Sequence, residues 1–282
     1  MALQPNYPVV NLGDLYVQGG RMAYSTTTAF TVAAGQFRDS TNINDIVIAA
    51  STVSISSNGL NALDTGTIAA STIYYVYAIG SSIYGADNGQ DNAASQGNSG
   101  STTYPDNYLP AGCIISLVNG QPTLPFGYDM WRRIGAIRTT AGSAIEPFTQ
   151  TGFGKNRTMR YQTPVAPGAA ATAGTTSYAT IGALLAIVPQ IPVDVIIEAS
   201  LAPATAGDSL YLAPYGNTVA AGGYQNRMSA AVIQPAAQYL QMICPGAFNA
   251  AATPVIEVDY ATTAGAGTTA VTFVVTGYID VI

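Results

Sequence analysis

Histidine is absent from the sequence, and cysteine occurs only twice in 282 residues. Without histidine the commonest general base is missing, so catalytic arrangements of the Ser-His-Asp or Cys-His type are excluded. Cys113 and Cys244 lie one in each half of the chain and form no CxxC pair, which excludes a zinc site built from Cys and His within one chain. We expect two buried free thiols, and a single disulfide between the halves is the alternative.

Nucleotide-binding motifs are missing as well, because there is no GxxxxGK[ST] segment and no GxGxxG segment after a predicted strand. A glycosidase-type carboxylate pair remains formally possible, but the three glutamates have no local signature. A calcium loop at Asn61 and Asp64 would need more carboxylates at regular spacing. We therefore predict a protein that is not an enzyme and that needs no cofactor and no metal.

Charged residues make up only 9% of the chain, where about 25% is usual. The net charge is −6, so the basic surface of a nucleic-acid-binding protein is not expected. The pair Arg132 and Arg133 and the cluster 155–160 are local exceptions. We interpret them as solvated rims or subunit-interface charges, with contact to an acidic partner surface as the alternative.

Long apolar segments are also lacking. Residues 1–5 have neither the basic region nor the apolar stretch of a signal peptide. The longest apolar run, Ile181–Val188, is too short to span a bilayer. We expect synthesis in a cytoplasm and no membrane insertion.

What the sequence does contain favours strands and turns: Thr, Val, Ile, Tyr and Gly are abundant, whereas helix-favouring Glu and Lys are rare. The predicted fold class is all-β, with two β-rich domains at residues 1–155 and 156–282. The boundary is placed in the Gly-, Pro- and Arg-containing stretch 139–163. In the second half, apolar runs recur between Pro and Gly residues, which predicts a β-sandwich of jelly-roll type. These runs are Tyr178–Val188, Val193–Ala199, Ser209–Ala213, Met228–Ile233, Tyr239–Ile243, Val255–Tyr260 and Ala270–Tyr278.

The most distinctive stretch is Pro122–Arg138, which holds the only tryptophan. Pro125 and Gly127 predict a turn, because Pro fixes φ and Gly tolerates positive φ. Before it, Ile73–Ile79 is β-branched or aromatic almost throughout and predicts a buried strand. Asn119-Gly120 predicts a hairpin turn.

After the turn, residues 131–138 predict a strand with charges at its rims. Simple alternation along this strand assigns its side chains to two faces. One face would carry Arg132, Ile134, Ala136 and Arg138, and the other Trp131, Arg133 and Ile137.

The segment 80–103 is rich in Gly, Asn and Asp. It contains too little apolar surface to order itself, so we predict a mobile surface loop. Its polar residues could bind a cation or a sugar, but solvation of the loop is the preferred interpretation. The residues concerned are Asp87, Asn88, Asp91 and Asn92.

Five segments occur in an order that resembles a module of tailed-bacteriophage virion proteins: DSTNINDIVI, LDTGTIAASTIYYVYAI, PAGCIISL, PTLPFGYDMWRRIGAIRT and PFTQTGFG. The resemblance covers residues 39–154; the 80–103 insert and the second half depart from it. It implies a virion structural protein of the fibre, neck or capsid-decoration type, made in the host cytoplasm and attached to the particle through residues 1–155. The structural and interface residues would be Tyr74, Tyr75, Tyr77, Pro125, Gly127, Trp131, Arg132, Arg133 and Arg138.

The expected partners are other virion proteins and further copies of the chain. With so few charges, exposed strand edges cannot all be guarded by Lys or Glu, and closed symmetric association is another protection. The resemblance to fibre modules favours a homotrimer. The alternative function is a receptor-binding adhesin, a tail fibre or spike, in which Tyr211, Tyr215 and Tyr224 stack on the sugar rings of a host surface glycan.

Overall fold

The computed structural model describes residues 16–82, 109–167, 172–173, 179–181, 184–203, 209–216, 227–229, 238–248, 256–262 and 269–282. Every regular element in these ranges is a β-strand, which confirms the predicted all-β class. Tyr224 and the four polar loop residues between 87 and 92 lie outside the described residues.

The first half of the chain contributes two small sheets. One has the order β1 (Val17–Gly19), β4 (Gly35–Arg38) and β5 (Asp45–Ile48). The other has the order β10 (Met130–Arg138), β8 (Ile73–Gly80), β9 (Gly112–Ser116) and β7 (Ala62–Leu63). All eight residues of β8 are buried, as predicted for this aromatic and β-branched strand.

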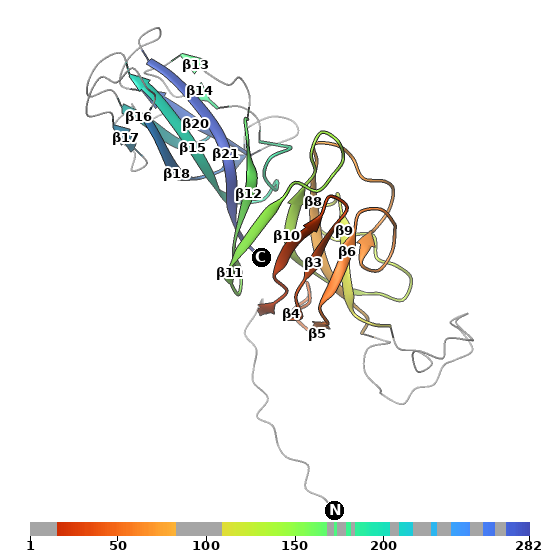
Figure 1. Cartoon of the computed structure of the whole chain (residues 1–282). Helices are drawn as coiled ribbons and strands as arrows, with labels where there is room; N and C mark the ends of the chain where they lie inside the picture. The colour runs from red at the N-terminus through yellow and green to blue at the C-terminus, as the bar shows by residue number, and fades with distance from the viewer. Residues whose placement is uncertain are drawn as a thin grey trace, which may run out of the picture.

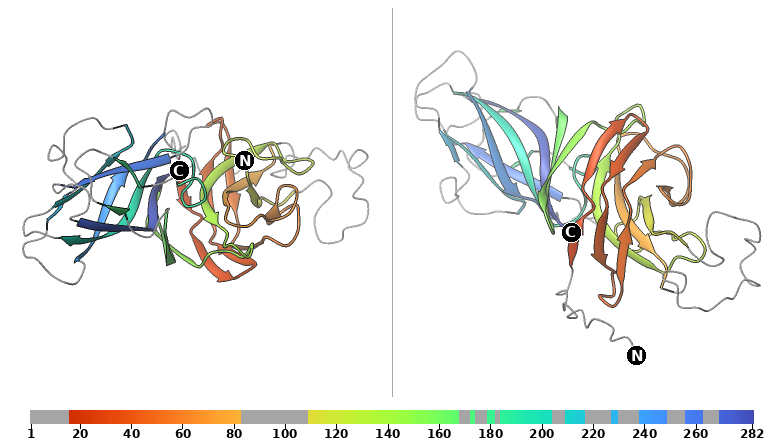
Figure 2. Two further views of the ribbon diagram at one scale, coloured as in Figure 1. Left: turned by 90° about the horizontal axis from the view of Figure 1, so that it is seen from above. Right: turned by 60° about the horizontal axis from the view of Figure 1, so that its bottom comes forward.

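The largest sheet combines strands from both halves. Its order is β18 (Gln238–Pro245), β15 (Val193–Pro203), β21 (Thr269–Val281), β12 (Asn156–Val165), β11 (Phe148–Phe153), β2 (Met22–Thr26), β3 (Ala29–Val32) and β6 (Ser51–Ser54), with β13 (Thr172–Ala173) paired to β21. Figures 1 and 2 show two lobes side by side, with β11 and β12 between them and the C-terminus at the junction. The boundary at 155 falls in the turn of the β11–β12 hairpin, whose strands pair from Phe148 opposite Tyr161 to Phe153 opposite Asn156. The division into two domains stays a prediction.

The second lobe is a β-sandwich, as the spacing of its apolar runs predicted. The β18-β15-β21-β12 part of the large sheet packs on a sheet of order β14 (Ala179–Thr180), β20 (Ile256–Thr262), β16 (Ser209–Pro214) and β17 (Arg227–Ser229), with β19 (Ala247–Phe248) paired to β20. Tyr260 and Phe273 meet between the two layers with ring centroids 5.0 Å apart. Within the apolar run Tyr178–Val188, strand β14 accounts for Ala179–Thr180. Residues 184–188 form a turn instead of a strand, in which Leu184 O accepts hydrogen bonds from the backbone of Ile187 and Val188.

The two predictions for turns near the central stretch have different outcomes. The turn at Pro125 is confirmed: Tyr128 N donates to Pro125 O at 3.1 Å, and Gly127 has φ of 86°. The hairpin at Asn119-Gly120 is wrong. Strands β9 and β10 lie on opposite sides of β8, so the chain crosses over β8 instead of turning back beside β9.

A β-bulge between Arg133 and Gly135 overturns the predicted faces of β10. Arg133 lies opposite Tyr77, but after the bulge Ala136 lies opposite Tyr75. Residues that lie opposite each other share a face of the sheet, so Arg133, Ala136 and Arg138 all lie on the face of Tyr75 and Tyr77. Gly135 in the bulge has φ of 157°, a backbone conformation that residues with a Cβ rarely adopt.

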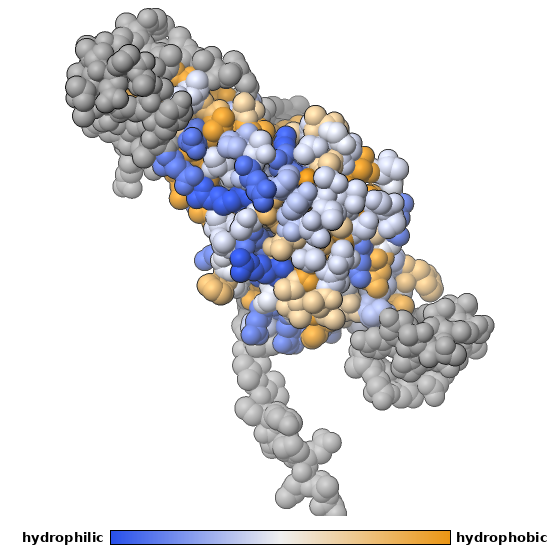
Figure 3. All heavy atoms as spheres, in the orientation of Figure 1, coloured by the Kyte–Doolittle hydropathy of each residue, from blue (hydrophilic) through white to orange (hydrophobic). Residues whose placement is uncertain are grey.

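Several large apolar side chains are exposed on the described surface. Phe153 at the β11–β12 hairpin is 93% exposed, and Phe126 at the tip of the Pro125 turn is 82% exposed. On the face drawn in Figure 3, residues of intermediate hydropathy cover most of the N-terminal lobe, and strongly hydrophilic residues gather in a few groups. This surface agrees with the scarcity of charge in the sequence.

Candidate functional site

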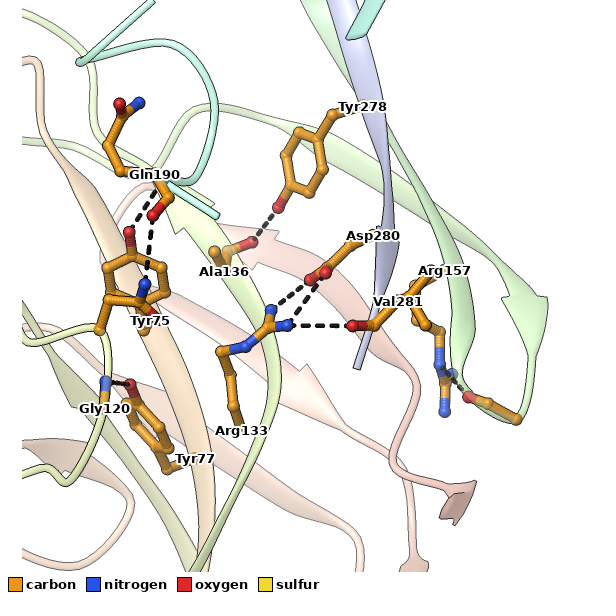
Figure 4. Close-up of polar contacts among 12 residues, drawn as sticks. Tyr75, Tyr77, Gly120, Arg133, Ala136, Arg157, Gln190, Tyr278, Asp280 and Val281 are labelled. Carbon is orange, nitrogen blue, oxygen red and sulfur yellow. Dashed lines mark hydrogen bonds and ion pairs between the residues drawn. The ribbon is translucent and has the colours of Figure 1, made fainter. Parts of the chain in front are cut away.

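The distinctive residues of β8 and β10 meet the second half of the chain at one junction (Figure 4). At its centre Arg133 forms a two-pronged ion pair with Asp280 of β21: Nη1 donates to Oδ2, and Nη2 donates to Oδ1 at 3.0 Å. Nη2 also donates to the backbone oxygen of Val281 at 3.2 Å. Asp280 is only 1% exposed. Burial disfavours the charge of Arg133, but the hydrogen bonds and charge of Asp280 outweigh it and raise the arginine pKa above its usual value.

Two tyrosines continue the junction on either side of this ion pair. Tyr278 donates its hydroxyl proton to Ala136 O at 3.0 Å, and Tyr75 accepts a hydrogen bond from Gln190 N at 2.9 Å. The Gln190 side chain in turn accepts from Ile256 N at 2.8 Å. Burial raises the pKa of both tyrosines, so their hydroxyls stay neutral and serve as hydrogen-bonding groups.

Arg138, at the end of β10, holds the turn at residues 184–188. Its Nε donates to Ala186 O at 2.8 Å, and its Nη1 donates to the carboxylate of Glu146 at 3.0 Å. The hydroxyl of Tyr161 donates to Ile187 O from the other side of the turn. Glu146 is buried, and its carboxylate is paired with Arg138.

The remaining framework residues pack within the first lobe. Tyr77 donates to Val118 O at 2.6 Å and accepts from Gly120 N at 3.1 Å, and its ring lies edge-on to Trp131 with centroids 5.6 Å apart. Tyr74 accepts a hydrogen bond from Ala69 N at 2.7 Å.

Arg132 differs from Arg133 and Arg138. Its side chain points to the other face of β10, opposite Ala78, and no hydrogen bond or ion pair among the described residues involves its guanidinium. Burial lowers its pKa. Among the three predicted interface arginines it is therefore the one that is half-buried without a described polar partner.

The tyrosines predicted to bind glycan do not form a described exposed group. Tyr211 is 4% exposed in β16, so its ring is not available for stacking at the surface. Tyr215 is half-buried just after that strand.

The described residues also limit the metal interpretations. They contain no group of three His, Cys, Asp or Glu side chains placed to hold a metal ion. Asp64 instead caps local backbone, accepting from Thr65 N at 2.7 Å and Thr123 N at 3.2 Å. Cys113 and Cys244 are both buried and not joined in a disulfide, as expected, and burial raises the pKa of the Cys113 thiol to about 12. Within the described ranges no helix has the length and apolar character needed to cross a membrane.

Sequence reasoning identified one half of the junction and missed the other. Tyr75, Arg133 and Arg138 were singled out, but Gln190, Tyr278 and Asp280 were not. The available signal was Asp280, an acidic residue within the otherwise apolar closing segment GYIDVI. A charge in a strand of that composition indicates a buried partner.

Comparison with known proteins adds little to this description. The chain matches no protein-family model and no curated protein sequence. Among solved structures it is similar to the VP2 subviral particle of infectious bursal disease virus, with 14% identity and a TM-score of 0.25; the match covers 98% of this chain and 74% of that chain. A TM-score this low carries no argument about fold or function, so the function is argued from the residues of the junction.

Proposed function

We propose that the protein is a non-enzymatic structural component of a bacteriophage virion, a fibre, neck or capsid-decoration protein that attaches to the particle and assembles as an oligomer. The observation that carries the proposal is the commitment of its distinctive polar residues to internal bonds. Arg133 is bonded to Asp280, Arg138 to Glu146, and Tyr75 to Gln190. These groups stiffen the junction between two β-rich lobes and are not aimed at a substrate.

The proposal includes self-association, with a homotrimer as the favoured state. Few surface charges are present to guard strand edges, and Phe126 and Phe153 are large exposed apolar side chains of the kind that interfaces cover. Copies of the chain and other virion proteins are the proposed partners. Arg132 is the proposed polar contact at such an interface.

Two measurements test this proposal. Immunogold electron microscopy of purified particles should label the virion at a defined place, and unlabelled particles would contradict it. Light scattering of the purified chain should give a trimer at low salt and at about 1 M NaCl, because apolar burial is not screened by ions. A monomer in both conditions, or a trimer that dissociates in salt, would contradict the proposed association.

The structure argues against the adhesin alternative with the three tyrosines named from the sequence. It relied on Tyr211, Tyr215 and Tyr224 as a stacking surface, and Tyr211 is buried. A glycan would need a different place on the molecule.

A further inference from the structure

The large sheet opens where strands from the two halves meet. Strands β2 and β11 share a single register pair, Thr149 opposite Ala23. The side chain and backbone of Gln150 hold them together there: Arg21 Nε donates to Gln150 O at 2.8 Å, and Met22 N donates to Gln150 Oε1 at 2.7 Å. Beyond this point the ladder is not continued, and a solvent-open hollow of about 710 Å³ lies between the strands.

The walls of this hollow combine apolar and polar groups and are almost uncharged. Hydroxyl and amide groups come from Thr31 of β3, Thr52 of β6, Thr149 of β11 and Gln162 of β12. All four residues are exposed to solvent. Among the described residues no aspartate or glutamate lines the hollow, so an anionic ligand would meet no opposing carboxylate from them.

One cation belongs to the lining. Arg21 is exposed and uses only Nε in its bond to Gln150, and none of the ion pairs among the described residues includes it. Its two terminal nitrogens can therefore form the fork that pairs with a carboxylate.

We propose that this hollow binds an acidic saccharide. The uronate carboxylate pairs with the terminal nitrogens of Arg21, and the sugar hydroxyls bond to Thr31, Thr149 and Gln162. The volume lies within the roughly 300–1,000 Å³ typical of small-ligand sites and accommodates one or two sugar rings. The neutral hydroxyl and amide groups suit hydroxyl recognition, and the unopposed arginine supplies charge complementarity.

Calorimetric titration of the full chain with digalacturonic acid, and separately with neutral galactobiose, tests the proposal. We expect saturable binding of the acid and at least tenfold weaker binding of the neutral sugar, because it lacks the charged hydrogen bonds. Arg21→Ala should reduce affinity for the acid about tenfold or more without changing that for galactobiose. Arg38→Ala is the matched control, since Arg38 pairs with Asp45 outside the hollow, and its affinity should equal that of the wild type.

Arg21 also helps to hold β2 against β11, so a second variant separates binding from folding. Gln162→Ala removes an exposed side chain from the wall of the hollow. It should lower the binding affinity for both sugars severalfold and leave the thermal unfolding midpoint unchanged. No saturable binding by the wild type, or an Arg21→Ala variant that binds the acid as tightly as the wild type, overturns the proposal. If the wild type binds no sugar and light scattering shows a lower molar mass for Arg21→Ala, the hollow is a contact between copies of the chain. That result also overturns the saccharide proposal. None of these outcomes affects the particle-labelling test of the virion role.

Discussion

Replacing Asp280 by alanine should destabilise the protein more than the loss of any exposed ion pair. Asp280 is the carboxylate to which Arg133 is bonded, and its side chain is 2% exposed while that of Arg133 is 16% exposed. Asp280→Ala leaves the guanidinium in the junction with only the backbone oxygen of Val281 as a described partner. The remaining charge has lost its counter-ion and has only limited access to water.

The expected cost follows from measurements on buried pairs. Removing one member of a buried ion pair costs about 3–5 kcal/mol, because an uncompensated charge stays inside. At about 2–4 °C per kcal/mol for a chain of this size, the thermal midpoint should fall by roughly 6–20 °C. Asp45→Ala is the matched control: Asp45 is 33% exposed, while its partner Arg38, at 17%, is about as exposed as Arg133, and ion pairs with an exposed carboxylate contribute about 0–1 kcal/mol.

Differential scanning calorimetry and urea unfolding of both variants would measure these differences. A third variant, Arg133→Met with Asp280→Leu, replaces the pair by apolar groups of similar size and should be close to the wild type or more stable. Equal midpoints for Asp280→Ala and Asp45→Ala would refute the argument that the junction depends on the buried pair. So would a double variant as unstable as Asp280→Ala, because the loss would then come from packing and not from an unpaired charge.

Three further outcomes are expected. Burial would raise the pKa of Asp39, but hydrogen bonds from residues 41–44 outweigh this effect and hold the pKa of the folded protein below 3.8. The ionised carboxylate therefore stabilises the fold above pH 3.8, and this stabilisation is lost as the pH falls through the folded pKa. The difference in unfolding free energy between wild type and Asp39→Asn should shrink from about pH 5 to about pH 2, and a constant difference would contradict this. Because burial raises the pKa of the Cys113 thiol to about 12, it should not react with a disulfide reagent at about pH 8 until the chain is unfolded, and rapid labelling of folded protein would show the site to be open. Gly277→Ala places a Cβ 2.0 Å from Met159 O and should cost about 1–3 kcal/mol or more in urea unfolding. Gly142→Ala, with 3.8 Å to its nearest neighbour, should be nearly neutral, and equal effects at the two glycines would contradict the clash.

The sequence by itself determined the local features of this protein. The aromatic and β-branched run at residues 73–79 became a strand because those side chains pack well on a pleated, buried surface. The turn at Pro125 and Gly127 formed because Pro and Gly favour its dihedral angles wherever the rest of the chain lies. Such preferences act over a few residues, so they can be recognised without the fold.

Only the tertiary structure decided which residues meet. The bulge after Arg133 shifts the alternation of β10 and puts Arg133 and Arg138 on one face, although the local sequence predicts opposite faces. The partner of Arg133 is Asp280, 147 residues away. Pairing over such distances depends on which apolar faces are buried together and on how the register is set between remote strands. No local pattern records either, and for that reason half of the junction and the hollow between β2 and β11 emerged only from the folded chain.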